Sequence, residues 1–169
     1  MPLVQSFAPI EQADTRILIL GSMPGEASIR AGQYYAHPQN LFWHIMGELL
    51  GINLRSPDDY DRRVQALKSA RIALWDVLHS CRRKGSLDSS IENASLIPND
   101  FAAFFLSHPH ITHVFFNGAK AEACYRRHVQ PVIKARAVKY LRLPSTSPAN
   151  ASIPYEHKLK AWRAVAMHT

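Results

Sequence analysis

The feature that most constrains the fold of this chain is the alternation of short apolar runs with longer stretches of helical periodicity. Four runs have the length and composition of β-strands, at residues 16–20, 72–75, 113–116 and 138–141. The first three are almost continuously apolar, which is typical of parallel strands that are covered on both faces. The fourth alternates between apolar and polar residues, so we expect it at an edge of the sheet.

Amphipathic helical patterns lie between these runs. They cover residues 38–50, 57–69, 99–107, 119–133 and 154–167. Pro38 is expected at the start of the first helix and Gly51 at its end. Strands that alternate with helices predict βαβ units, and therefore an α/β fold with a mostly parallel sheet. One polar segment with glycine and serine, residues 79–97, is expected to form a long functional loop.

Length and composition narrow the class of protein. The chain has 169 residues, of which 47% are apolar and 20% charged, and this predicts one globular domain over residues 1–169. No apolar run approaches the roughly 18 residues of a membrane-spanning helix, and the first residues show no secretory signal. Two cysteines are too few for a disulfide framework, a four-cysteine zinc site or an iron–sulfur cluster. We therefore expect a cytoplasmic protein with no cofactor, no bound metal and no membrane partner.

The charge of the chain is unevenly distributed. Its 20 Lys and Arg against 13 Asp and Glu give a formal net charge of +7. Residues 1–60 hold three basic and six acidic side chains, whereas residues 61–169 hold seventeen basic and seven acidic ones. A basic half of this kind suggests a polyanion partner, nucleic acid first, with Arg126 and Arg127 as candidate phosphate contacts. The alternative is that these side chains only form solvated faces of helices.

Ligands of open α/β sheets bind beyond the carboxyl ends of the strands, and polar segments follow each predicted strand. These segments are residues 21–25, Asp76 with the loop after it, Asn117-Gly118 and residues 143–150. Another segment, residues 34–43, gathers aromatic, histidine and asparagine side chains just before a helix. Asn40 there can be a simple cap and Tyr35 a core residue, or the two can supply a water-orienting amide and a stacking face.

The histidines between residues 108 and 113 form a run that looks like a metal site. No acidic or cysteine partner stands at a suitable spacing, so we expect a loop at the end of a helix. The chain also lacks the H-x-E and P-C-x-x-C signature of zinc deaminases. The sequence therefore predicts no metal ligands.

Four motifs together are similar to those of the uracil-DNA glycosylase superfamily. They are Gly21-Ser22-Met23-Pro24-Gly25, Ala36-His37-Pro38-Gln39-Asn40-Leu41-Phe42-Trp43, the strand-terminal Asn117, and Leu143-Pro144-Ser145. Their order and spacing fit from residue 16 to residue 165. The combination most resembles the hypoxanthine-DNA (deoxyinosine) glycosylase branch, with similarity to mismatch-specific uracil-DNA glycosylase. The resemblance implies a three-layer α/β/α sandwich around a four-stranded parallel sheet in the order 2-1-3-4.

Two positions depart from the usual motifs of the superfamily. Met23 stands where most members carry a water-activating Asn or Asp, and Leu143 stands where they carry His or Asn. The hypoxanthine branch lacks the first of these groups, so the resemblance implies that Asn40 positions the water. Donors near Ser145 would then support the charge that develops on the base. Glu26 and Asp76 remain alternative bases.

The resemblance also implies the roles of the other site residues. Tyr35 would stack on the base and Asn117 would read it, with Ser22 and Met23 beside them. One Asn side chain complements the carbonyl and ring N–H that hypoxanthine and uracil share, whereas adenine and cytosine present the reversed pattern. The implied DNA contacts are Pro144, Ser145, Thr146, Ser147, Arg126 and Arg127.

The activity implied by the resemblance is that of a monomeric, monofunctional and metal-independent DNA glycosylase. Its substrate would be DNA that contains deaminated bases, hypoxanthine first, in base excision repair. One alternative is a glycosylase for uracil or xanthine. Another is a catalytically silent nucleic-acid-binding protein of the same fold. A third is a small-nucleoside hydrolase or a nucleotide-binding domain, although the basic charge argues against free nucleosides, which carry no phosphate.

Overall fold

The computed structural model describes residues 2–134 and 136–169 of the chain. At its centre is a four-stranded sheet of β3 (Ile72–Asp76), β2 (Ile17–Gly21), β6 (His113–Asn117) and β7 (Lys139–Leu143), in this spatial order. All three neighbouring pairs are parallel. Counted along the chain, these four strands have the order 2-1-3-4, so the predicted order and the edge position of the last strand are confirmed.

The sheet is buried because its central strands are apolar on both faces. Every residue of β2 and β3 is buried, and β6 is partly exposed only at His113. Along β2, alternate side chains join different apolar clusters. Ile17 and Ile19 belong to one, and Leu18 and Leu20 belong to the other. A strand of this kind requires a helical layer on each side.

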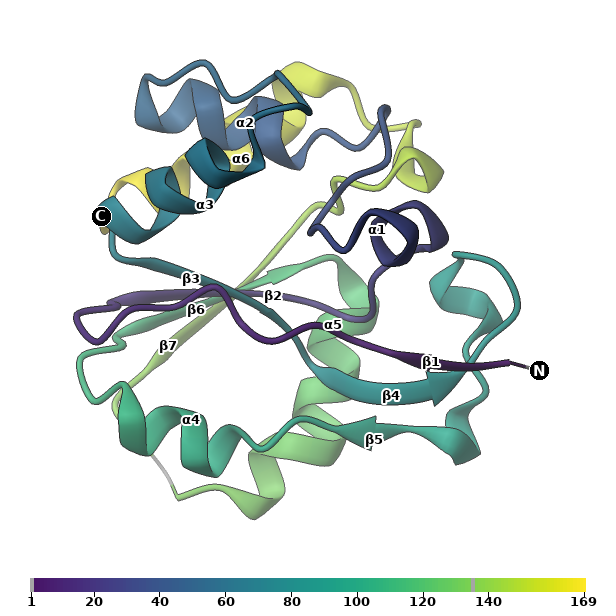
Figure 1. The fold of residues 1–169 in the computed structure, drawn as a ribbon. Coiled ribbons are helices and arrows are strands. Elements are labelled where there is room, and N and C mark those ends of the chain that lie inside the picture. Colours follow the sequence, from purple (N-terminus) through teal and green to yellow (C-terminus); the bar gives the residue numbers. More distant parts are fainter. Residues whose placement is uncertain (1, 135) are drawn as a thin grey trace.

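Helices provide these two layers. On one face lie α2 (Phe42–Leu50), α3 (Tyr60–Ser69) and α6 (Tyr155–Ala166), and on the other lie α4 (Phe101–Ser107) and α5 (Ala119–Cys124) (Figure 1). Trp43 and Trp162 anchor the first layer and Phe101 anchors the second, each almost completely buried. The predicted three-layer α/β/α sandwich is therefore confirmed.

The predicted start of the first helix at Pro38 is wrong. Residues 37–40 form a separate turn, in which the backbone N–H of Asn40 donates to the His37 carbonyl at 2.9 Å. The helix α2 begins at Phe42, whose N–H is capped by the side chain of Asn40. A turn closed by a side chain competes with helical hydrogen bonds, so the helix starts one turn later.

The pattern over residues 119–133 is also not one α-helix. The helix α5 ends at Cys124, and a π-helical turn, Tyr125–Val129, and a 3₁₀ turn, Gln130–Val132, follow it. Pro131 lies in the last turn and has no N–H to donate, so it cannot continue a helix. Arg126 and Arg127 lie in the π-helical turn, and both are exposed.

The segment predicted as one long loop, residues 79–97, is instead largely structured. The strand β4 (Leu78–Arg82) pairs antiparallel with β1 (Leu3–Gln5) and β5 (Ile97–Pro98) in a second, three-stranded sheet. Two 3₁₀ turns, Asp88–Ser90 and Asn93–Ser95, lie between β4 and β5. The prediction failed because β4 is short and mixed in composition, and its pairing partners are distant in the sequence.

The short helix α1 (Glu26–Ala31) was not predicted. Its six residues are too few to show a periodic pattern, and it ends at Gly32, which has a positive φ of 65°. The helix follows β2 directly and places residues 22–26 above the end of the sheet (Figure 1). In the part of the chain that the structure describes, no helix is long and apolar enough to cross a membrane.

Candidate active site

A cavity of about 1010 Å³ lies at the carboxyl ends of the parallel strands. It gathers all the segments that the strand-end rule selects, together with the aromatic segment before α2. The predicted site residues that line it are Ser22, Met23, Glu26, Tyr35, Asn40, Asp76, Asn117, Pro144, Ser145, Thr146 and Ser147. Arg126 and Arg127 do not line it. The fold therefore brings distant motifs to a single site.

Asn117 is held in one orientation by Thr146. Its Oδ1 accepts from the Thr146 N–H at 3.0 Å, and its Nδ2 donates to the Thr146 hydroxyl at 3.0 Å. The two bonds use one N–H and one lone pair of the amide, so a second N–H and a second lone pair remain for a ligand. Because Asn117 is 8% exposed and ends the buried strand β6, the amide is a rigid donor–acceptor pair.

The same threonine connects Asn117 to the segment that carries Asn40. The carbonyl of Thr146 accepts from the N–H of Leu41 at 3.1 Å. The side chain of Thr146 is fully buried. Thr146 thus connects the two amides, a link that the sequence alone did not suggest.

Asn40 lies at the rim of the cavity, in front of α2. Its Oδ1 accepts from the N–H of Phe42 at 2.9 Å, which fixes the amide. The other lone pair of this oxygen and the Nδ2 donors can hold a water molecule. The simple capping role and the water-orienting role considered from the sequence are therefore compatible, because one oxygen can accept two hydrogen bonds.

Tyr35 is held in an unusual backbone conformation. Its φ is +54°, a left-handed value that is unfavourable for a bulky residue. The neighbouring Tyr34 is fixed by three hydrogen bonds, since its N–H donates to Tyr60, its hydroxyl to Ala8, and its carbonyl accepts from Trp43. Such strain persists where the surroundings over-determine the backbone, and it is common at functional sites.

The aromatic ring of Tyr35 is stacked on Phe42, with ring centroids 4.3 Å apart and an angle of 23° between the planes. Only the opposite face of the ring is left for a planar ligand. Burial raises the pKa of the Tyr35 hydroxyl well above its usual range, with the charge of Asp76 adding to the rise and the Asn117 amide opposing it. The Tyr35 hydroxyl therefore stays uncharged at every physiological pH.

The first motif is apolar where the family carries a polar group. Met23 is 8% exposed and packs into the same apolar cluster as Leu18 and Leu20. Ser22 donates its hydroxyl hydrogen to Asp88 at 2.5 Å. Leu143 at the start of the last motif is buried as well. Neither departure from the motifs leaves a polar side chain there to hold water.

The segment after β4 closes one side of the cavity and was not recognised from the sequence. Three contacts join it to the first motif. Asp88 accepts from Ser22, the Ser86 hydroxyl accepts from the Glu26 N–H at 2.8 Å, and the buried Arg83 donates to the Pro24 carbonyl at 2.5 Å. Partners 59 to 66 residues apart leave no local pattern in a sequence.

The two candidate carboxylates lie in different surroundings. Glu26 is exposed at the rim, at the start of α1. Asp76 ends β3 at the floor of the cavity and is 3% exposed. Burial first, and then the nearby charge of Asp88, raise the pKa of Asp76 from 3.8 to about 7, against the opposing effect of the Arg83 guanidinium. Asp76 therefore exchanges its proton near neutral pH.

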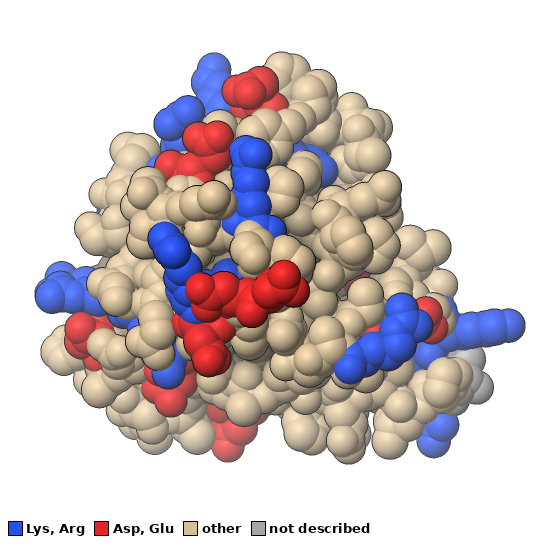
Figure 2. All heavy atoms as spheres, turned by 45° about the horizontal axis from the view of Figure 1, so that its top comes forward, with Lys and Arg blue, Asp and Glu red and all other residues tan. Residues whose placement is uncertain are grey.

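The basic side chains do not form one continuous patch on the face shown in Figure 2, where Lys and Arg lie interspersed with Asp and Glu. Arg126 is exposed and lies 3.5 Å from Glu122, which is also 3.6 Å from Arg142. Arg142 lines the cavity, as does Lys120, and neither was singled out from the sequence. These two cations lie closer to the site than Arg126 and Arg127.

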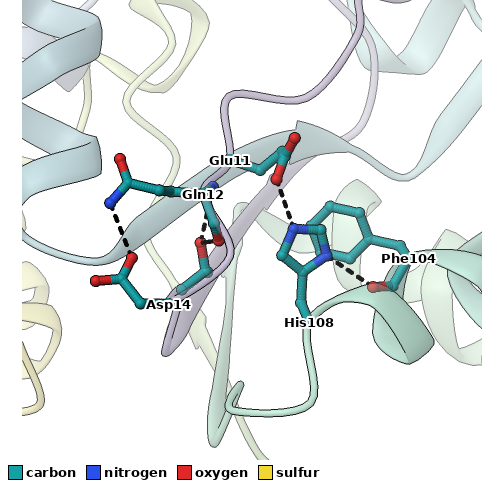
Figure 3. Close-up of polar contacts among 6 residues, drawn as sticks. Glu11, Gln12, Asp14, Phe104 and His108 are labelled. Carbon is teal, nitrogen blue, oxygen red and sulfur yellow. Dashed lines mark hydrogen bonds and ion pairs between the residues drawn. The ribbon is translucent and has the colours of Figure 1, made fainter.

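The histidine run forms a structural contact. His108, just after α4, places Nδ1 2.8 Å from the Phe104 carbonyl and Nε2 2.6 Å from the Glu11 carboxylate (Figure 3). The contact ties the end of α4 to the segment before β2. No three His, Cys, Asp or Glu side chains are grouped to hold a metal ion among residues 2–134 and 136–169.

An α/β/α sandwich whose strand-end cavity combines an aromatic ring with two fixed amides is suited to bind a planar, polar ligand. The sequence comparison gives the family. A profile of the Uracil DNA glycosylase superfamily matches residues 8–166, and the chain belongs to this superfamily.

Two curated relatives are archaeal proteins named hypoxanthine DNA glycosylase. The one from Methanosarcina barkeri is 38% identical over 146 residues, which are 86% of this chain and 87% of the relative. The one from Methanosarcina acetivorans is 35% identical over 164 residues, 97% of this chain and 98% of the relative. The solution NMR structure of a candidate uracil DNA glycosylase from M. acetivorans superposes with a TM-score of 0.82 at 35% identity, covering 99% of this chain and 98% of that one.

Proposed function

We propose that this protein is a monofunctional DNA glycosylase that hydrolyses the N-glycosidic bond of a deaminated base in DNA, with hypoxanthine as its main substrate. The observation that carries the proposal is the placement of Asn40 and Asn117 in one cavity, linked through Thr146. Relatives named hypoxanthine DNA glycosylase, which cover nearly the whole chain, support it. The protein acts on DNA, as a single chain that contains the whole cavity.

Recognition begins with a base that leaves the DNA stack. Extrusion costs a few kcal/mol and is least costly for a mispaired base. Stacking on the free face of Tyr35 returns roughly 1–3 kcal/mol. The free N–H and lone pair of Asn117 then bind the carbonyl and ring N–H of the base. Adenine and cytosine present two groups of the wrong polarity to the same amide, so the fixed orientation of Asn117 rejects them.

Hydrolysis then requires a water molecule and support for the departing base. Asn40 holds the water, and the bond between the base and C1′ breaks towards an oxocarbenium-like sugar. Donors beside the base, including the Ser145 region, stabilise the charge that develops on it. Pro144, Ser145 and Ser147 form the wall of the cavity that faces DNA, and the nearby cations Lys120 and Arg142 join Arg126 and Arg127 as phosphate contacts.

The test is excision from labelled DNA duplexes that contain hypoxanthine, uracil or xanthine, followed by alkali to reveal abasic sites. We expect hypoxanthine to be released fastest. Asn40→Ala should lower this rate by about 10²–10³-fold, the usual effect of losing one orienting group. Asn53→Ala is the matched control, because Asn53 makes the same type of bond, to the Arg55 N–H at 3.2 Å, outside the cavity.

The other outcomes are equally informative. If uracil or xanthine is released faster than hypoxanthine, that base is the main substrate, and the proposed glycosylase reaction still holds. DNA binding without release of any base would support a catalytically silent member of the fold, a possibility favoured by the apolar packing of Met23 and Leu143. An Asn40→Ala protein with the unchanged rate would refute the role of Asn40.

A further inference from the structure

The floor of the cavity contains two buried polar atoms that lack a hydrogen-bond partner in the described part of the chain. They are the hydroxyl oxygen of Tyr35 and Oδ2 of Asp76. Leaving a buried polar group unpaired is unfavourable. Both side chains line the cavity, so a ligand that enters it can supply the missing partners. The role proposed above for Tyr35, stacking, uses the face of its ring; the nearby Asn117 amide lowers the pKa of the hydroxyl but forms no well-aligned hydrogen bond with it.

Both groups converge on a gap that only glycine leaves open. A methyl group on Gly21 would lie 2.6 Å from Oδ1 of Asp76 and 2.8 Å from the hydroxyl oxygen of Tyr35. Gly21 and Asp76 are also paired residues at the ends of the neighbouring strands β2 and β3. The carboxyl group of Asp76 and the inner end of the Tyr35 ring therefore face each other across Gly21.

This arrangement places Asp76 at the edge of a base rather than at the sugar. If a base stacks on the free face of Tyr35, one edge of the base lies over the hydroxyl end of that ring. Asp76 lies at this same end. Asn40, the residue proposed to hold the water, lines the same cavity from a different segment, just before α2. Asp76 is thus placed to interact with the leaving group.

Purines differ from uracil at this edge in one useful way. Hypoxanthine has ring nitrogens, N3 and N7, that accept hydrogen bonds beyond the carbonyl and N–H read by Asn117. In uracil, the one ring nitrogen that is not bonded to the sugar, N3, carries a hydrogen and can only donate. A carboxyl group that keeps its proton is a donor and complements such an acceptor, whereas a carboxylate would repel it.

On the basis of the proposed function, we propose that Asp76 is a purine-specific catalytic acid, whose carboxyl group donates a hydrogen bond to an acceptor ring nitrogen of the flipped hypoxanthine and transfers the proton as the base leaves. The surroundings keep this proton available near neutral pH. Burial raises the pKa of Asp76 to about 7, and of the charged groups that face it Asp88 raises it and Arg83 lowers it. The neighbouring tyrosines, Tyr34 and Tyr35, stay uncharged because burial raises their pKa values above the usual range.

The step balances in protons and electrons. The bond between N9 of the base and C1′ breaks, and its electron pair goes to the base while the proton of Asp76 goes to the acceptor nitrogen. The water held by Asn40 adds its oxygen to C1′ and releases a proton to solvent. The Asp76 carboxylate then regains a proton from solvent, so the net reaction is hydrolysis and the base leaves uncharged.

The decisive experiment compares the unchanged protein with Asp76→Asn in single-turnover release of hypoxanthine between about pH 5 and pH 9. Asparagine keeps the shape and a donor but cannot transfer a proton. We expect the variant to be slower by about 10²-fold or more, the usual contribution of a general acid. The unchanged protein should also slow as the pH rises through about 7, and the variant should lose this decline. Asp100→Asn, at the exposed cap of α4, is the matched control.

Substrate analogues give a second readout that a purely structural role would not change. Duplexes with 3-deaza- or 7-deazahypoxanthine each lack one acceptor nitrogen. One of the two should slow the unchanged protein to nearly the rate of the variant and have little further effect on the variant. Affinity for an uncleavable 2′-fluoro deoxyinosine duplex, and the melting temperature, show whether the variant still binds and folds.

Each failure points to a different conclusion. A folded Asp76→Asn protein with the unchanged rate and pH profile, or unaffected release of both deaza bases, overturns the assignment of Asp76 and leaves the proposed function standing. If the variant slows the release of uracil as much as that of hypoxanthine, Asp76 is not purine-specific and the inference is refuted. If the unchanged protein releases no hypoxanthine, the proposed function itself fails.

Discussion

Replacing Asp76 with asparagine should stabilise the folded protein increasingly as the pH rises. Asp76 is almost completely buried, and its pKa is raised from 3.8 to about 7 by this burial. Because the folded state holds the proton more tightly than the unfolded state, its stability falls as the pH rises from about 4 to about 7. The asparagine side chain does not ionise, so its contribution to the stability of the folded protein stays constant between about pH 4 and pH 7.

The structure sets the size of this effect. At about 1.4 kcal/mol for each pKa unit, a rise from 3.8 to about 7 corresponds to about 4 kcal/mol in total. Between about pH 4.5 and pH 8.5, the range accessible to experiment, the expected change is about 3 kcal/mol. The unpaired amide of asparagine costs about 1–3 kcal/mol as well, but this cost is the same at both pH values and cancels from the comparison.

The assay is urea unfolding of both proteins at about pH 4.5 and pH 8.5. The free energy of unfolding of the variant, relative to that of the unchanged protein, should be about 3 kcal/mol higher at the alkaline pH than at the acid pH. Thermal melting should show the same trend as a change of roughly 6–12 °C in the relative melting temperature. A difference that is equal at both pH values would show that Asp76 ionises like an exposed carboxyl group, and the reasoning from burial would be wrong.

Four further outcomes are expected. Gly21→Ala should destabilise the protein in thermal melts and slow base release at least tenfold, because its methyl group would overlap two buried polar groups; an active variant that melts normally would contradict this. Asn117→Ala should blur the choice between deaminated and normal bases in the excision panel, and retained discrimination would exclude it as the reader. DNA affinity should fall with salt, with a log–log slope of about −0.9 per phosphate contact, and reversing the charge of Arg126 and Arg127 should make this slope less steep; an unchanged slope would leave both as solvated surface. Base release should survive a chelator, since the described residues include no grouped metal ligands, and loss of activity that zinc restores would refute this.

Much of the central sheet could be predicted because its information is local. A run such as residues 17–20 is apolar at every position, and this is sufficient to place it between two layers of helices. The strand-end rule then brought Asn117 and the segments after β2, β3 and β7 to one edge before any coordinates were known. Asn40 was found through its motif, because its position just before a helix does not by itself distinguish a cap from a water-binding amide.

Other parts of the site left no local trace. The chain after Asp76 was expected to be a loop, but it forms β4, which is fixed by pairing with β1 more than 70 residues earlier. The roles of Asp88 and Arg83 depend on partners 66 and 59 residues away, respectively. The left-handed backbone of Tyr35 is imposed by the bonds of its neighbour to distant segments, and tyrosine itself gives no indication of it.

The sequence by itself determined the fold class, the strand order that the motifs imply and the identity of the two amides. The fold class follows from apolar periodicity and turn residues, which act over a few neighbouring positions, whereas the strand order and the two amides follow from the resemblance of the motifs to a known family. Only the tertiary structure decided what surrounds each polar group. The proton affinity of Asp76 depends on its burial beside Gly21 and on the charges of Asp88 and Arg83, and these neighbours meet only when the chain has folded. Electrostatic energies follow distance and burial in space, so the same aspartate would be an ordinary acid in an exposed loop.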